Sequence, residues 1–238
     1  MKKKTGILSK IYIAILLIFL YSPIAVLIFY SFNNGKTTVW KGFTFKWYVQ
    51  LFRDDNIMNA LWNTVIIAVL ASVFATILGT AAAIGISNFK GKKRMLIQNA
   101  SNIPIISPDI VMGVSLMLLF TTLGVIFNFE MGFFTVLISH ICFCVPFVVL
   151  NVMPRIKRMD QSIYDAALDL GCSQWQAFYK VIIHELMPGI VSGLLMSFTY
   201  SLDDFIITYF TRGAKFQNLS IEIYSMTHRR ISPKINAL

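Results

Sequence analysis

Long apolar runs, separated by shorter polar stretches, make up most of this chain of 238 residues. Five of the runs are long enough to cross the roughly 30 Å hydrocarbon layer of a bilayer as helices. The third run is uninterrupted only from Ile110 onwards. We nevertheless predict that this span begins earlier, at Ile103. We predict an all-α bundle of transmembrane helices, with a single membrane domain over residues 1–238 and no soluble domain. The expected spans are residues 11–32, 63–86, 103–126, 131–152 and 190–210.

The longest polar stretch lies between the fourth and fifth runs, at residues 155–189. Its pattern predicts two short helices separated at Gly171, because glycine interrupts a helical sequence. The first helix covers about 163–170. The second follows a capping box at 173–176 and reaches about Ile183. A folded loop of this kind on a membrane protein is typical of a docking surface for another protein.

Composition indicates an integral membrane protein and excludes a soluble globule. Hydrophobic residues make up 56% of the chain and charged residues 13%, and the mean hydropathy is +0.68. Soluble domains carry about 25% charged residues. The net charge of +10 does not indicate a nucleic-acid partner, because the basic clusters adjoin apolar runs, where anionic head groups of the lipid bilayer are nearer.

Basic clusters beside the runs predict the orientation of the chain. Lysines at 2–4 precede the first run, which is long and lacks a small-residue cleavage site. We therefore expect a retained anchor with a cytoplasmic N-terminus. Clusters at 90–94 and 155–158 then lie on the cytoplasmic side, as the positive-inside rule requires. The loop at 155–189 faces the cytoplasm in this multi-pass arrangement.

The sequence offers no catalytic machinery. The three cysteines share no ligand spacing with His140 or with the other two histidines, and neither a phosphate-binding glycine loop nor a serine–histidine–aspartate series occurs. We expect no metal site, no cofactor and no enzymatic activity. Energy for transport would then come from another subunit or from a gradient.

Carboxylates within or beside apolar runs are the next sign of function. Asp109, Asp203 and Asp204 occupy such positions, where an ionised acid costs roughly 2.5 to 3.5 kcal/mol to insert. The same runs hold no lysine or arginine, so a cationic substrate is a natural counter-charge. Tyr200 and Ser201 each lie three residues before one of the acids, and therefore on the same helix face. The pattern predicts a cation path lined by these side chains.

These residues also have structural interpretations. Residues 107–109 are typical of a helix start, with serine as the N-cap and aspartate near the positive end of the helix dipole. Asp203 and Asp204 would alternatively be buried at a helix interface and hydrogen-bonded to a neighbour. Trp47, in the loop after the first run, would either offer its ring to an ammonium group or anchor the loop at the membrane interface.

The polar loop resembles the EAA loop of ABC-importer permeases, whose pattern begins E-A-A-x-x-x-G. Asp165, Ala166, Ala167 and Gly171 occupy the motif positions, and aspartate keeps the charge of the usual glutamate. After the glycine the sequence departs from the pattern, since its proline stands later, at Pro188. The resemblance implies a coupling surface on which a cytoplasmic ATPase docks.

Three segments, at 103–113, 197–205 and 223–226 with Ser232 and Pro233, resemble permeases of spermidine/putrescine ABC transporters of the PotC type. The likeness covers essentially the whole chain. It implies a MetI-like permease of the bacterial inner membrane that pairs with a second permease. A dimer of ABC ATPase subunits would bind ATP and Mg²⁺, and an extracytoplasmic binding protein would deliver the polyamine. The family has six spans, whereas this sequence shows five and ends at residues 235–238, where the sixth is expected to begin.

The resemblance also implies roles for individual residues. Asp169, in the polar loop, is assigned to coupling with the ATPase. The alternatives are an ABC importer of another solute, such as ferric iron, and a cation transporter driven by a gradient. The docking loop argues against a gradient-driven carrier, which has no need of it. The positions assigned to polyamine uptake are Trp47, Asp109, Ser201, Asp203 and Asp204.

Overall fold

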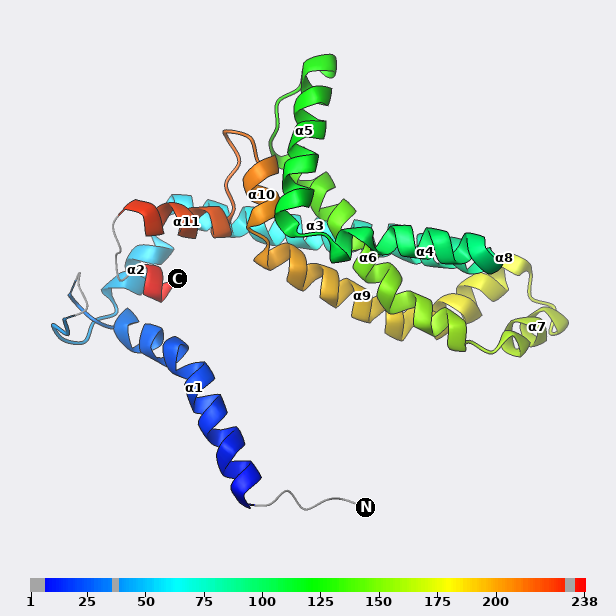
Figure 1. The fold of residues 1–238 in the computed structure, drawn as a ribbon, viewed down its shortest axis with the longest axis horizontal. Helices are drawn as coiled ribbons and strands as arrows, with labels where there is room; N and C mark the ends of the chain where they lie inside the picture. Colours follow the sequence, from blue (N-terminus) through cyan, green and yellow to red (C-terminus); the bar gives the residue numbers. More distant parts are fainter. Residues whose placement is uncertain (1–6, 36–38, 230–233) are drawn as a thin grey trace. The chain divides into compact units, whose positions relative to one another are not determined.

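The computed structural model describes residues 7–35, 39–229 and 234–238, so the lysines at 2–4 and the pair at 232–233 lie outside the described residues. The described residues are almost entirely helical (Figure 1). The helical elements are α1 (Ile7–Ser31), α2 (Lys46–Phe52), α3 (Asp55–Asn88), α4 (Gly91–Ile106), α5 (Asp109–Phe127), α6 (Phe133–Arg158), α7 (Gln161–Asp169), α8 (Gln174–Ala177), the π-helical segment η1 (Phe178–Ile182), α9 (Ile183–Asp203), α10 (Ile206–Thr211), α11 (Leu219–Arg229) and α12 (Lys234–Ala237).

Five helices among the described residues are long and apolar enough to cross a membrane. Four of them are α1, α3, α5 and α6. The fifth joins α8, η1 and α9 into one continuous helix over Gln174–Asp203. The expected all-α class and the expected number of spans are therefore confirmed.

The third span begins later than the sequence suggested. Helix α4 ends at Ile106, Ser107 is extended, and α5 begins at Asp109. The start at Ile103 is wrong because Pro108 has no N–H group and disfavours a helical conformation in the residue before it. Ser107 is not the N-cap either. Its hydroxyl donates to the carbonyl of Ile103 at 2.9 Å, and Pro108 takes the N-cap position.

The fifth span also differs from the expected range of 190–210. The helix that follows the capping box does not stop near Ile183 but runs on to Asp203. Gly189 and Gly193 do not end this helix; they lie where it packs so closely on α6 that a Cβ would collide with it. Beyond Asp203 the chain leaves the helix and re-enters one only at α10. The range expected to form a single helix is therefore divided between α9 and α10.

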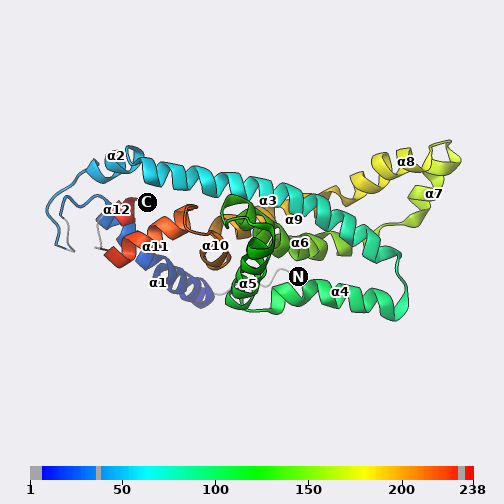
Figure 2. The same cartoon turned by 90° about the horizontal axis from the view of Figure 1, so that it is seen from above.

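Residues 61–221 form one compact unit, in which α6 packs against α9. Figure 2 shows both helices beside α3, which contributes alanines to the same core. A Cβ on Gly193 would lie 3.2 Å from Val148 Cα, and one on Gly79 would lie 2.6 Å from Val148 Cβ. Small residues thus allow three helices to approach closely, which matters in a bilayer because lipid is as apolar as the side chains.

A second compact unit consists of residues 1–60 and 222–238. Asp54 and Lys234 form an ion pair within it. The hydrogen bond from Lys234 holds the pKa of the Asp54 carboxyl below its usual value. The expectation of one membrane domain over the whole chain stays a prediction.

Candidate translocation and coupling sites

The break in the fifth span is built around Asp204. This residue is extended, with a ψ of 128°, between the end of α9 at Asp203 and the start of α10 at Ile206. Its carboxylate accepts hydrogen bonds from the N–H groups of Ile207 at 3.2 Å and Thr208 at 2.8 Å. The first N–H groups of a helix have no partner within it, so the Asp204 side chain stabilises the break by capping α10.

His140, on α6, lies at the centre of a buried polar network around this break. Its side chain is 1% exposed. The Nδ1 atom lies 2.7 Å from the hydroxyl of Ser201 on α9. The Nε2 atom lies 2.9 Å from the hydroxyl of Thr208 on α10 and 3.4 Å from Asp204 Oδ2. Asn218 donates to the same threonine hydroxyl at 3.3 Å. One ring therefore connects α6 to the helices on both sides of the break.

The residues expected to line a cation path separate into two groups. Ser201 and Asp204 both contact His140, and their side chains point into the protein: Ser201 is buried, and the Asp204 side chain is 8% exposed. Asp203 and Tyr200 are exposed. Asp203 makes no side-chain hydrogen bond or ion pair with any residue that the structure describes. The Tyr200 ring stacks on Phe147 of α6, with 4.3 Å between the ring centroids.

Asp109 is exposed at the first position of α5. One turn later, Gly113 allows α5 to pack closely on α10. A Cβ at this glycine would lie 2.9 Å from the ring of Phe210 and 3.4 Å from the carbonyl oxygen of Ile206. The expected helix-start role of Asp109 agrees with its position. Its helix also touches the segment that follows the break.

Trp47 lies in the other compact unit, at the start of α2. It is buried, and its indole N–H donates to the carbonyl of Asn33 at 2.7 Å. The Lys46 ammonium lies 5.8 Å from the centre of its ring, within the range of a cation–π contact. These contacts favour a role in anchoring the loop after α1. Contact with a substrate ammonium stays a prediction.

The polar loop has the two helices that the sequence predicts, and the turn between them explains its glycine. Gly171 has a φ of +85°, a conformation that glycine adopts at little cost. The N–H groups of Gly171 and Cys172 donate to the carbonyls of Leu168 and Ala167 at 2.9 and 3.0 Å. This is the Schellman pattern that ends a helix.

The caps of the two loop helices are also formed. Ser173 and Gln176 make the expected capping box, with side-chain to backbone distances of 3.3 and 3.0 Å. Asp160 caps α7 by accepting from the N–H of Ser162 at 2.9 Å. That hydrogen bond holds the pKa of the Asp160 carboxyl below its usual value. The loop is therefore a defined structure rather than a flexible connection.

The side chains of this loop differ in exposure. Asp165, Ala166 and Asp169 are exposed, whereas Ala167 is buried. Three large side chains that the sequence analysis did not single out are also on the surface: Leu170 is 87% exposed, Trp175 80% and Tyr179 74%. Large exposed apolar side chains on a structured loop are typical of a protein-binding face. We call Leu170, Trp175 and Tyr179 the apolar patch of the loop.

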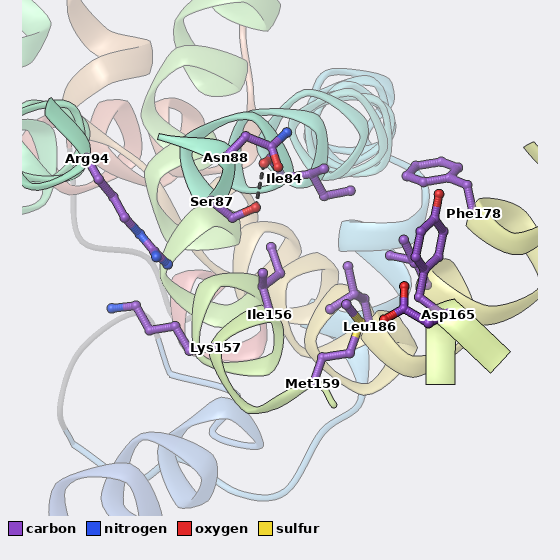
Figure 3. A pocket seen from close by; sticks show the side chains of 12 residues that line it. Ile84, Ser87, Asn88, Arg94, Ile156, Lys157, Met159, Asp165, Phe178 and Leu186 are labelled. Atoms are coloured by element: carbon purple, nitrogen blue, oxygen red, sulfur yellow. Dashed lines mark hydrogen bonds between the residues drawn. The ribbon is translucent and has the colours of Figure 1, made fainter. Parts of the chain in front are cut away.

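Behind the loop lies a cavity of about 850 Å³ between α7 and the adjoining ends of α3 and α6. In Figure 3, Asp165 and Phe178 are on one side of this cavity, and Arg94 and Lys157 are on the other. A hydrogen bond from Arg94 to the sulfur of Met153 at 3.6 Å holds α4 on α6. The loop therefore adjoins the ends of two spanning helices. The lining residues are Ile84, Ser87, Asn88, Arg94, Ile156, Lys157, Met159, Tyr164, Asp165, Phe178, Ile182 and Leu186.

His140 is the functional candidate that sequence reasoning missed. Its spacing to the cysteines indicates no metal site, and the sequence pattern assigns it no other role. The signal that would have found it is its position inside an apolar run, where an ionisable side chain requires a polar partner. The acids and hydroxyls near the end of the fifth run were the available partners.

Comparison with known proteins identifies relatives over most of the chain. The family profile described as "Binding-protein-dependent transport system inner membrane component" matches residues 75–228. The spermidine/putrescine transport system permease protein PotC of Escherichia coli (strain K12) is 38% identical over 221 residues, which is 92% of this chain and 82% of that protein. The putrescine transport system permease protein PotI of the same strain is 37% identical over 226 residues, covering 92% of this chain and 80% of that protein.

Two solved structures of ABC transporters have a similar fold. A bacterial ABC transporter involved in the import of the acidic polysaccharide alginate gives a TM-score of 0.70 at 18% identity, covering 95% of this chain and 84% of that one. An amino acid ABC transporter with histidines gives a TM-score of 0.57 at 18% identity, covering 82% and 89%. At this identity the likeness concerns the fold alone.

Proposed function

Because the chain belongs to the family of binding-protein-dependent transport system inner membrane components, we propose that it is the permease subunit of an ATP-driven importer of polyamines such as spermidine and putrescine. Relatives with 36 to 38% identity, which are named for these substrates, support the substrate class. The exposed carboxylates support it by their charge. The protein is an inner membrane component with several spanning helices.

The remaining parts of the transporter follow from this assignment. The chain has no enzymatic activity of its own and holds no cofactor. A second permease subunit completes the path, and a dimer of ABC ATPase subunits binds ATP and Mg²⁺ and docks on the loop between α6 and α9. An extracytoplasmic binding protein delivers the polyamine. The N-terminus and the docking loop lie on the cytoplasmic side of a bacterial membrane, and no nucleic acid takes part.

One observation carries the substrate class: Asp203 is exposed and unpaired among the described residues, at the end of α9 and three residues after the exposed Tyr200 on the same helix. A polyamine is a chain of methylene groups between ammonium groups. The carboxylate attracts one ammonium group, and the aromatic face accepts a second one or the adjoining methylenes. The C-terminal end of a helix carries partial negative charge, which adds to the attraction.

The continuous helix of the fifth span provides a connection through which movements driven by ATP hydrolysis are transmitted to Asp203. One helix of 30 residues runs from the capping box of the docking loop to Asp203, a distance of about 45 Å. When the ATPase subunits move the loop, this helix carries the displacement to the break. The π-helical segment η1 near its start is a place where the helix can deform, because such segments interrupt the regular hydrogen bonding.

Asp109 provides a second carboxylate for the same path. Its helix packs on α10 through Gly113, so it follows any movement of the segment after the break. Ser201 and Asp204 serve the path indirectly, by holding the break in shape. This division of roles differs from a path in which all of the acids contact the substrate.

The test is uptake by the assembled transporter in proteoliposomes. The ATPase, the second permease and the binding protein are reconstituted with and without this chain, and radiolabelled spermidine and putrescine are offered with ATP inside. We expect ATP-dependent uptake only when the chain is present. Equal uptake without the chain would refute the proposal. Uptake that needs an ion gradient but no ATP would instead support the gradient-driven alternative.

A further inference from the structure

We propose that His140 is a positioning residue for translocation: it clamps α6 to both sides of the break in the fifth span and so keeps Asp203 turned outwards. The proposal rests on the function proposed above and extends it to a residue that contacts no substrate. It starts from one fact, that a fully buried histidine from α6 touches Ser201 before the break and Thr208 after it.

The hydrogen bonds of this network are mutually consistent. With the proton on Nε2, the ring donates to Thr208 Oγ1, and the Ser201 hydroxyl donates to Nδ1. Thr208 then donates its own proton to Asp204 Oδ2 at 3.0 Å, while its oxygen also accepts from Asn218. Every donor named here finds an acceptor, and Thr208 Oγ1 and Asp204 Oδ2 each accept two hydrogen bonds, which the lone pairs of an oxygen allow. One tautomer of the imidazole therefore accounts for all of these hydrogen bonds.

The break depends on this network because the chain leaves the helix within an apolar span. Backbone groups released at such a point need partners, since lipid offers none. Asp204 supplies partners for two N–H groups of α10. Its carboxylate in turn needs polar neighbours, which are His140 and Thr208. Without the imidazole, Ser201 and Thr208 would each lose a hydrogen-bond partner at a buried position.

The consequence for transport follows from the geometry of adjacent residues. In a continuous helix Asp203 and Asp204 would be about 100° apart. The extended conformation of Asp204 replaces that relationship with one in which the Asp204 side chain is only 8% exposed and Asp203 is exposed. Loss of the clamp lets the break relax, so Asp203 changes its orientation. His140 thus acts through Asp203, although no contact joins them.

Three substitutions separate the contributions of the ring atoms. His140→Phe keeps the ring and removes all its hydrogen bonds. His140→Gln places an amide donor near the position of Nε2, whereas His140→Asn reaches only the position of Nδ1. Because Nε2 makes the contacts across the break, we expect Gln to restore function better than Asn.

Uptake is measured in the assembled transporter as maximal rate and half-saturating polyamine concentration. We expect His140→Phe to lower the maximal rate divided by the half-saturating concentration by about tenfold. Membrane insertion and ATPase co-purification should not change. His140→Gln should recover at least about a third of the wild-type ratio. Adding Asp203→Asn to His140→Phe should cause little further loss, because interacting residues are not additive. Wild-type kinetics for His140→Phe, equal defects for Phe and Gln, or additive effects would overturn the proposal.

A second readout does not depend on the substrate. In a chain whose three native cysteines are replaced by alanine, Asp203→Cys is labelled with a polar maleimide in the solubilised transporter. We expect His140→Phe to change the labelling rate severalfold, and Tyr12→Phe, on the exposed surface of α1, to leave it unchanged. An unchanged rate in the His140 variant would contradict the clamp. If the wild type fails to transport polyamines, the proposed function is wrong, while this labelling still decides the role of His140.

Discussion

Asp203 and Asp204 are neighbours in the chain, but their carboxylates lie in different surroundings. Asp204 accepts hydrogen bonds from two backbone N–H groups and from Thr208 Oγ1, and it lies 3.4 Å from His140 Nε2. Asp203 is exposed and has no such partner among the described residues. The pair therefore combines a structural acid with one that is available to a substrate.

The first prediction compares the two acids. Asp203→Asn should lower polyamine uptake by about tenfold, because a hydrogen bond to a charged group contributes roughly 1.5–3 kcal/mol and about 1.4 kcal/mol corresponds to a factor of ten. Its thermal stability in detergent should not change. Asp204→Asn should lower both quantities, with a stability loss of about 1–3 kcal/mol from the weakened cap. Equal stability of the two variants would contradict the division of roles.

The second prediction concerns the turn of the docking loop. Gly171→Ala should reduce co-purification of the ATPase, because an alanine at a φ of +85° costs about 1 kcal/mol of backbone strain. No atom lies within 4 Å of the position of the new Cβ, so steric contact plays no part. Gly171→Asn is the matched control, since asparagine tolerates this conformation better. It should retain more ATPase than the alanine variant. The reverse order would show that the turn geometry does not matter.

The third prediction concerns the apolar patch of the loop. Trp175→Ala should weaken ATPase co-purification by at least about tenfold, because exposed tryptophans at interfaces often contribute 2 kcal/mol or more, on the order of alanine-scanning values. Trp62→Ala is the control. Trp62 is also exposed, at 61%, but lies in the membrane span of α3. Similar ATPase recovery with both variants would exclude the patch as the docking surface.

The fourth prediction tests the close packing of α3 on α6. Gly79→Ala places a Cβ 2.6 Å from Val148 Cβ and should destabilise the protein by about 1–3 kcal/mol through overpacking. Gly85→Ala, in the same helix, meets no atom within 4 Å and should be neutral or slightly stabilising. Melting temperatures of the two variants in detergent provide the measurement. A lower melting temperature for Gly85→Ala than for Gly79→Ala would contradict this packing.

Much of the fold could be predicted from the sequence because its signals are local. Apolar runs reveal spans, and the capping box at Ser173 and Gln176 and the turn at Gly171 depend only on near neighbours. The break at Asp204 could not be predicted in this way. It depends on His140, which lies more than sixty residues away in the chain. Composition and periodicity do not predict polar contacts between residues that are so far apart in the chain.

The candidate site was predicted in part for the same reason. Acids in apolar runs indicated where a cation path lies, and Asp203 is exposed as that prediction requires. Which acid is buried depends on the network with α6 and could not be decided from the chain alone. The apolar patch was missed because Leu170 and Trp175 are compatible with either a buried or an exposed face of a short helix.

The central claim is that a polyamine passes the end of α9 beside Asp203. The most direct measurement is photolabelling during ATP-driven turnover, with a spermidine derivative that carries a photoreactive group and with peptide mapping of the attachment sites. The account predicts label within residues 200–203, suppressed by excess spermidine and reduced in Asp203→Asn. Active transport with no label in this segment, or with label that excess spermidine does not suppress, would contradict it.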